Sequence, residues 1–308
     1  MIKTWSTPVQ DENRNEEPCA LCGGRDFSAY LRCEGFQYVR CRQCSLVQMN
    51  PQPDAEAVKR RYSGDDYLEY ELANEEAFLE LGLLTLADAG FYQFEGGLDP
   101  AERRVLDAGC ATGALLARLR ARGWQAEGVE LNERQADYAR RVRGLRVYGQ
   151  ALEDIPLESC SYTLILASHL IEHLRRPRSF LAEARRLLAP GGRLFLTTPN
   201  IDGFQPRLFA GRWRSAIFDH LYLFSAKTLT RLLEQEGFHI EKTVTWGGLA
   251  AGIAPRPVKF MFDKLAKLFG FGDVMLISCS LPAGGRVCKP PLSDPTAEPE
   301  LRFGDATA

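Results

Sequence analysis

The sequence predicts an α/β protein in which a doubly wound parallel sheet follows a small cysteine-rich module. Two observations support this prediction. Beyond Ala101, short apolar strand patterns alternate with helical patterns, and such a βαβ series builds a parallel sheet that helices cover on both faces. Five of the nine cysteines lie before residue 45. The alternating segments run over residues 105–106, 114–122, 128–130, 133–143, 146–148, 162–167, 179–188 and 194–198.

The composition allows one full-sized domain and a small module in 308 residues, of which 45% are hydrophobic. Lys and Arg total 38 against 40 Asp and Glu, so the overall charge attracts neither nucleic acid nor an anionic membrane. No apolar run is long enough to span a bilayer, and the first residues lack the apolar core of a signal peptide. We therefore expect a cytoplasmic protein with no membrane span and no nucleic-acid partner, and its oligomeric state stays open.

The cysteine pattern near the N-terminus is typical of a structural zinc site. Two C-x-x-C pairs, Cys19 with Cys22 and Cys41 with Cys44, flank eighteen residues that can form a short hairpin. The odd cysteine count and the missing signal peptide argue against disulfides, and four reduced cysteines in an ordinary loop are the plainer alternative. The sequence thus predicts a zinc ribbon at residues 18–53, in which four thiolates hold a structural Zn²⁺ and Cys33 is spare. Residues 1–17 are polar and are expected to be disordered.

The turn within residues 105–116 predicts a site for a nucleoside-containing cofactor. An apolar strand ends on Asp107, and Gly109 and Gly113 let the backbone approach a ligand before a helix begins. Glu130 closes the next strand pattern about 20 residues on, where a carboxylate can accept both ribose hydroxyls. The dehydrogenase fingerprint G-x-G-x-x-G fits poorly because residue 111 is alanine. Since the carboxylate of Asp107 suits a cationic ligand, S-adenosylmethionine is favoured over a nicotinamide, which ranks last.

Several blocks in fixed order make the chain resemble class I S-adenosylmethionine-dependent methyltransferases. Besides the glycine turn, these are Ser-His-Leu-Ile-Glu-His-Leu (168–174), Leu-Leu-Ala-Pro-Gly-Gly-Arg (187–193), Thr-Pro-Asn (198–200) and His-Leu-Tyr-Leu-Phe-Ser (220–225). The N-terminal pattern is similar to that of bacterial members with a zinc ribbon. The resemblance implies a Rossmann-like sheet of seven strands, the last of them antiparallel at the sheet edge, and helices in residues 54–100 that cover the cofactor.

The resemblance also implies a set of cofactor contacts. The glycine turn would form the methionine side of the pocket, with Cys110 contributing its backbone N–H and an inert thiol. Glu130 would bind the ribose, Leu131 would pack on the adenine, and two residues after the 146–150 strand would meet the adenine amino edge. The complete set is Asp107, Gly109, Cys110, Ala111, Gly113, Glu130, Leu131, Ala151, Leu152 and Ser168.

Three histidines are the candidate catalytic residues. His169, Glu172 and His173 also spell the inverted zinc-protease motif, but the apolar strand at 162–167 places His169 at a strand end, where α/β sheets bind ligands. The resemblance offers two roles for this block, a general base or a divalent-metal site like the E-x-x-E-H block of ubiquinone-pathway O-methyltransferases. Structural hydrogen bonding is the plainer alternative. His220 is a second candidate base, and its alternative is to seat the following helix.

The remaining segments complete a methyltransferase domain at residues 101–282. A helix capped by Ser225 should end at Gly237, and residues 239–246 and 273–280 should form the final strands. Apolar residues from Val258 to Phe269 share one helical face, for which core packing is favoured over a lid or a membrane-surface helix. The basic cluster Arg175-Arg-Pro-Arg178 suits a solvated face or a phosphate-bearing substrate. The tail at 283–308 is expected to be disordered.

These expectations define one function and two alternatives. The chain is predicted to transfer a methyl group from S-adenosylmethionine to oxygen or carbon of a small polar molecule, such as a sugar nucleotide, a glycan or a secondary metabolite. The first alternative is an RNA or protein methyltransferase whose ribbon grips the polymer. The second is a binding module that senses the cofactor without turnover.

Overall fold

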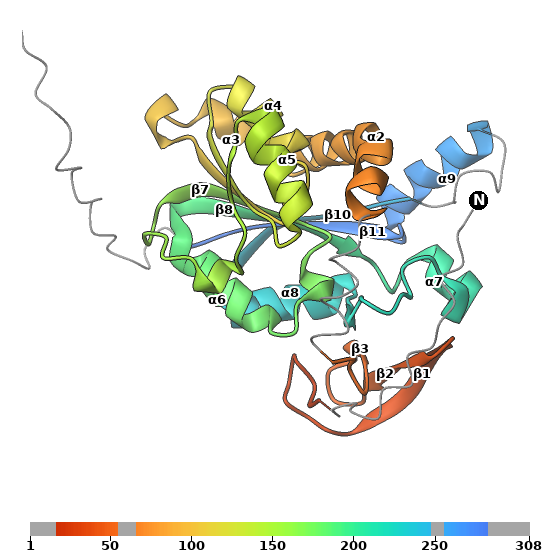
Figure 1. Cartoon of the computed structure of the whole chain (residues 1–308). Helices are drawn as coiled ribbons and strands as arrows, with labels where there is room; N and C mark the ends of the chain where they lie inside the picture. The colour runs from red at the N-terminus through yellow and green to blue at the C-terminus, as the bar shows by residue number, and fades with distance from the viewer. Residues whose placement is uncertain (1–16, 55–65, 248–255, 283–308) are drawn as a thin grey trace, which may run out of the picture.

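The computed structural model describes residues 17–54, 66–247 and 256–282 (Figure 1). The two ends expected to be disordered lie outside these residues, Glu17 excepted, as do residues 55–65 of the segment expected to be helical. No helix in the described ranges is both long and apolar enough to cross a membrane.

The main sheet has seven strands in the order β10-β11-β8-β7-β4-β5-β6. Five adjacent strands, β8, β7, β4, β5 and β6, run parallel to one another, whereas β11 is antiparallel to both β8 and β10. The predicted seven-stranded Rossmann-like sheet with its last strand antiparallel is confirmed. The strands are β4 (Arg104–Ala108), β5 (Gln125–Val129), β6 (Arg146–Tyr148), β7 (Tyr162–Ser168), β8 (Leu188–Pro199), β10 (His239–Trp246) and β11 (Val274–Ser280).

The expected place of the last strand at the sheet edge is wrong. β11 is inserted between β8 and β10, and Met275, Leu276 and Ile277 are completely buried there. An edge position would leave such an apolar strand open to pairing with other chains. β10 takes the edge instead, and its first half is largely exposed around Glu241 and Lys242.

Helices cover both faces of this sheet (Figure 1). One face carries α2 (Asp66–Asp88), α3 (Phe91–Gly96), α4 (Ala114–Ala121) and α5 (Glu133–Arg143). The other carries α6 (Pro177–Leu187) and α8 (Ala226–Gln235). Each set of helices packs its apolar side chains with strand residues into a separate core. Short 3-10 turns lie at η1 (Pro100–Glu102), η2 (Leu152–Asp154), η3 (Ile171–His173) and η4 (Ala210–Arg212).

The N-terminal module, residues 18–53, forms a second, antiparallel sheet with the order β1-β2-β3-β9. β1 (Phe27–Cys33) and β2 (Phe36–Cys41) make the expected hairpin, and β3 (Val47–Met49) follows. The fourth strand, β9 (Tyr222–Leu223), comes from the segment that follows the main-sheet strand β8. The N-terminal module is therefore joined to the main domain by a shared sheet, and five of its buried residues also belong to the core under α6 and α8. These are Cys19, Leu21, Cys41, Cys44 and Leu46.

Two further elements end the chain's fold. Ser225 caps α8 as predicted, since its Oγ accepts the Thr228 N–H at 3.1 Å, and Gly237 takes a left-handed φ of 85° after the helix. Core packing of α9 (Arg256–Phe269) is wrong for much of its apolar face. Leu268 and Phe269 are 74% and 69% exposed. The five cysteines before residue 45 are free, whereas Cys160 is disulfide-bonded, so the expectation of no disulfide is wrong at Cys160.

Candidate functional site

The glycine turn lies at the carboxyl end of β4, near the centre of the main sheet. Gly109, Ala111 and Gly113 have left-handed φ values of 78°, 49° and 76°. A Cβ on Gly113 would lie 2.5 Å from Leu145 Cδ1, so this position also requires glycine for space. A left-handed alanine is uncommon, and strain of this kind collects at ligand sites. The turn is thus shaped for close approach of a ligand to its backbone.

Glu130 is fixed by this turn. Its Oε2 accepts the Ala111 N–H at 3.0 Å, and its Oε1 accepts the Asn132 N–H at 2.7 Å. Both bonds favour the carboxylate, but burial outweighs them and raises its pKa. The side chain is therefore held rigidly at the end of β5, as a group that binds a ribose needs to be.

Asp107 and Glu71 make the same region strongly acidic. Asp107 is buried, and its Oδ1 has no hydrogen-bond donor among the described residues. Burial, with a smaller contribution from Glu130, raises its pKa to about 8. Burial also raises the pKa of Glu71 on α2 to about 7, with contributions from Glu130 and Glu75. Three carboxyl groups around one space favour a ligand with positive charge.

The other predicted cofactor contacts lie along the same edge of the sheet. Cys110 is buried against Gly128, and burial raises the pKa of its thiol well above the ordinary value, as an inert thiol requires. Leu131 is 62% exposed and offers an apolar surface. Leu152 is buried in η2, directly after Ala151, and the Ser168 hydroxyl bonds to Thr197 Oγ1 at 2.7 Å. The ends of β4, β5, β6 and β7 thus bring all ten residues to one edge.

The histidine block surrounds one buried carboxylate. Glu172 has no exposed surface, and its Oε2 accepts the Thr198 hydroxyl at 2.9 Å. Its Oε1 lies 3.2 Å from His169 Nδ1, and His169 itself has a left-handed φ of 50°. Burial opposes ionisation of Glu172, but the adjacent His169 and the other two histidines lower its pKa to about 2. The structure places His169 at the end of β7, as predicted, and not within a helix.

His173 and His220 face each other beside Glu172. Their ring centroids are 4.6 Å apart, and the rings are nearly perpendicular. His173 Nδ1 lies 2.9 Å from the carbonyl oxygen of Asp219, and His220 Nδ1 lies 2.8 Å from that of Ser215. Since a carbonyl can only accept, each Nδ1 carries a proton, and in the neutral form of either ring the lone pair is on Nε2. Burial and His173 lower the pKa of His220 to about 4, so this ring is neutral at pH 7.

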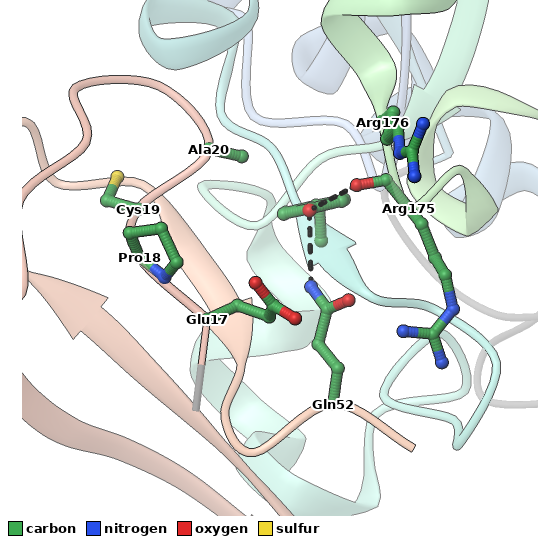
Figure 2. A pocket seen from close by; sticks show the side chains of 8 residues that line it. Glu17, Pro18, Cys19, Ala20, Gln52, Arg175 and Arg176 are labelled. Carbon is green, nitrogen blue, oxygen red and sulfur yellow. Dashed lines mark hydrogen bonds between the residues drawn. The ribbon is translucent and has the colours of Figure 1, made fainter. Parts of the chain in front are cut away.

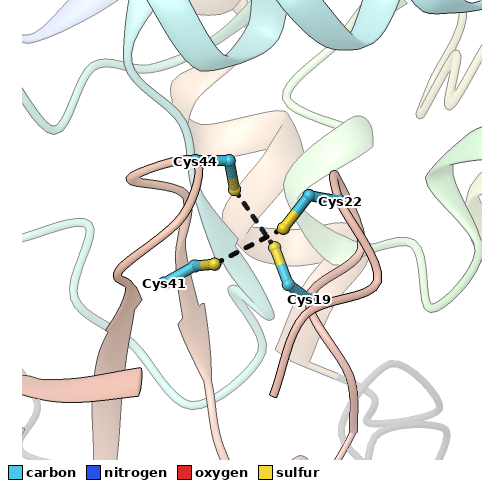
Figure 3. Close-up of side chains that lie close together, drawn as sticks. All are labelled: Cys19, Cys22, Cys41 and Cys44. Atoms are coloured by element: carbon cyan, nitrogen blue, oxygen red, sulfur yellow. Dashed lines mark hydrogen bonds between the residues drawn. The ribbon is translucent and has the colours of Figure 1, made fainter. Parts of the chain in front are cut away.

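The four predicted zinc ligands also come together (Figure 3). The Sγ atoms of Cys19 and Cys44 are 3.3 Å apart, those of Cys22 and Cys41 are 3.5 Å apart, and all four lie within 4.8 Å of one another. A tetrahedral Zn²⁺ with bonds of about 2.3 Å separates its sulfur ligands by about 3.8 Å. The cluster therefore fits the geometry of a structural zinc site.

Comparison with known proteins settles the family. A family model described as a methyltransferase domain matches residues 82–243, which is more than half of the chain. The chain belongs to this methyltransferase domain family. A protein of Mycolicibacterium smegmatis named "Probable S-adenosylmethionine-dependent methyltransferase" is 31% identical over 145 residues, covering 47% of this chain and 55% of that protein. The ubiquinone biosynthesis O-methyltransferase of Xanthomonas oryzae pv. oryzae is 31% identical over 163 residues, covering 50% and 62%.

The fold of the methyltransferase domain has solved counterparts. The crystal structure of a SAM-dependent methyltransferase from Thermotoga maritima aligns with a TM-score of 0.52 and 24% identity, over 73% of this chain and 98% of that one. This likeness confirms the class I methyltransferase fold. The chain spans less than two thirds of the length of the two curated relatives above, and the N-terminal module lies outside the family match.

Two residues near the methyltransferase site have no counterpart in the sequence predictions. Glu71 reaches the acidic region because α2 lies over the glycine turn, where Thr112 Oγ1 donates to Glu75 Oε2 at 2.9 Å. Tyr38 of β2 places its hydroxyl 2.8 Å from the carbonyl oxygen of His220. Neither contact has a local pattern that would reveal it, since both depend on how distant segments pack.

Proposed function

We propose that this chain transfers a methyl group from S-adenosylmethionine to an oxygen of a small polar molecule. The observation that carries the proposal is the buried Glu172 with the paired rings of His173 and His220, which lie on the same sheet edge as the glycine turn. The wider set of acceptors expected from the sequence includes sugar nucleotides, glycans and secondary metabolites. The relative from Xanthomonas oryzae pv. oryzae, which is named an O-methyltransferase, supports oxygen over carbon.

Cofactor binding would use the acidic region. The Asp107 Oδ1 without a donor suits the cofactor's ammonium group, and Glu130 would accept hydrogen bonds from the ribose hydroxyls. The exposed Leu131 would pack on the adenine ring. The bound cofactor would supply a methyl group on a cationic sulfur, which the surrounding carboxyl groups favour electrostatically.

Acceptor activation would use the histidine pair. A hydroxyl within reach of Nε2 of His173 or His220 can pass its proton to that nitrogen. The hydroxyl oxygen then forms a bond to the methyl carbon while the carbon–sulfur bond breaks, and S-adenosylhomocysteine leaves. Holding the oxygen in line with the methyl group supplies most of the rate in such a displacement. Glu172 would hold the imidazolium that forms, because its carboxylate is buried beside both rings.

The same three side chains favour a second route to the same product. Their ligand atoms lie within 4.8 Å of one another, and two imidazole nitrogens with one carboxylate are a common divalent-metal set. Both Nδ1–H groups already bond to backbone carbonyls, which is how metal-binding histidines are commonly oriented. A cation there would lower the pKa of the acceptor hydroxyl in place of a general base.

Calorimetric titration with S-adenosylmethionine and S-adenosylhomocysteine tests the proposal, with NAD as the control and a zinc assay on the same sample. Micromolar binding of the first two and about one zinc per chain are expected. Transfer of labelled methyl groups to sugar nucleotides, glycans and hydroxylated metabolites, with and without EDTA, then separates the metal route from the base route. Cofactor binding without methylation of any acceptor would favour a sensing module, and salt-sensitive methylation of RNA would favour the polymer alternative.

A further inference from the structure

A cavity of about 380 Å³ lies between the N-terminal module and the methyltransferase domain (Figure 2). Glu17 and Gln52 line one side, next to the zinc-site cysteine Cys19, and Arg175 and Arg176 line the other. The volume falls in the range of pockets that hold small molecules. The complete lining is Glu17, Pro18, Cys19, Ala20, Gln52, Arg175, Arg176 and Tyr222.

The polar groups of this cavity are only partly used by the protein. Gln52 Nε2 donates to the Tyr222 hydroxyl at 3.2 Å, and this hydroxyl donates to the Arg175 carbonyl at 3.2 Å. The Arg175 guanidinium donates through Nη2 to the carbonyl of Pro53. Within residues 17–54, 66–247 and 256–282, neither the Arg176 guanidinium nor the Gln52 Oε1 has a hydrogen-bond partner. Donors with positive charge therefore face free oxygen acceptors.

This combination of groups matches one class of ligand. Two guanidinium groups lie across the cavity from one carboxylate, and guanidinium forks fit phosphate oxygens. The Glu17 carboxylate and the Gln52 Oε1 can accept hydrogen bonds from the hydroxyl groups of a sugar. An anion that also carries several hydroxyls satisfies both sides of the cavity.

The cavity is lined by residues that follow the two paired histidines closely in the chain. Tyr222 follows His220 by two residues and Arg175 follows His173 by two, and two extended residues span about 7 Å. The two segments stay side by side, since the Leu221 N–H donates to the Glu172 carbonyl at 2.8 Å and the Tyr222 hydroxyl reaches Arg175. The cavity therefore lies about two residues of chain away from each histidine, close enough for a sugar-sized ligand bound there to approach them.

We infer that this cavity is the acceptor site and that it takes a phosphorylated sugar, with phosphate on Arg175 and Arg176 and hydroxyls on Glu17 and Gln52. The inference rests on the proposed methyl transfer and narrows its substrate class. It gives the N-terminal module a direct role, because the module supplies half of the site. Sugar phosphates and nucleotide sugars share this chemistry, and the experiment separates them.

Calorimetric titration of the zinc-loaded full chain with glucose 1-phosphate and UDP-glucose tests the inference, with glucose and inorganic phosphate as controls. Saturable binding of at least one phosphorylated sugar is expected, and Arg176→Ala should weaken it by roughly tenfold or more. Arg118→Ala removes an exposed arginine of α4, away from the cavity, and should change nothing. Glu17→Gln should weaken binding of the sugar phosphate and not that of inorganic phosphate.

The inference is overturned if no phosphorylated sugar binds saturably, if Arg176→Ala binds as tightly as the wild type, or if inorganic phosphate binds as well as the sugars. Titration of the same samples with S-adenosylhomocysteine keeps the two proposals apart. Loss of sugar binding with normal cofactor binding defeats only the acceptor site. Failure of S-adenosylhomocysteine to bind defeats the proposed function, whichever sugar binds.

Discussion

Replacing Asp107 with asparagine should stabilise the protein without cofactor and weaken cofactor binding. Asp107 is buried, one of its oxygens lacks a donor, and its pKa is raised from 3.8 to about 8. The unfolded chain therefore ionises this carboxyl near pH 4, whereas the folded protein holds the proton until about pH 8. Folding stability is consequently lost as the pH rises through this window. Asparagine has a similar shape and does not titrate, so the variant escapes this loss.

The size of the effect follows from the pKa difference. Each pH unit between the two pKa values costs about 1.4 kcal/mol, so the wild type should lose about 2 kcal/mol relative to Asp107→Asn between pH 6 and pH 7.5. Comparing two pH values cancels any constant cost of burying the amide, and the four-cysteine cluster is common to both proteins. Urea unfolding at both pH values, without cofactor, measures the difference. Parallel changes in stability for the two proteins would refute the reasoning.

Three other substitutions test the remaining assignments. Glu130→Ala removes the acceptor for two backbone N–H groups as well as the ribose contact, so S-adenosylhomocysteine should bind at least a hundredfold more weakly by calorimetry; an unchanged Kd would exclude Glu130 from the site. His220→Ala should keep cofactor affinity while methyl transfer slows by about 10²- to 10⁴-fold, and equal loss of binding would contradict that division of roles. Cys41→Ser should lose zinc in a metal assay, and the N-terminal module should then exchange its amide hydrogens faster. Cys33→Ser should keep its zinc and its protection from exchange. Unchanged metal content in Cys41→Ser would refute the zinc site.

Local patterns in the sequence were enough to predict much of this molecule. The glycine turn, the strand-helix alternation and the paired C-x-x-C motifs each depend on neighbouring residues, and the structure brings their members together. The sequence identifies the 169–173 block and His220 as separate candidates, but their arrangement around Glu172 needed the fold, because 46 residues separate His173 from the Asp219 carbonyl that accepts its Nδ1–H. Glu71 could not be predicted, since only the packing of α2 over the glycine turn makes it part of the site.

The inner position of β11 and the exposure of α9 could not be predicted for a different reason. β11 is inserted one place in from the edge, and strand patterns carry no record of which neighbour each strand pairs with. α9 shows the helical periodicity of a buried element, yet periodicity does not say which surface an apolar face meets. Both differences are tertiary in origin.

The pairing of β3 with β9 restricts how this protein could be rebuilt. Val47 lies opposite Leu223, and Gln48 lies opposite Tyr222, so the N-terminal module borrows its last strand from the segment that carries His220. Deleting the module would leave β9 with an unpaired edge two residues from a candidate catalytic histidine, and grafting the module onto another methyltransferase would leave β3 without one of its two partner strands. A working chimera would have to exchange residues 18–53 and the 213–224 segment as one unit, even though more than 150 residues lie between them in the chain.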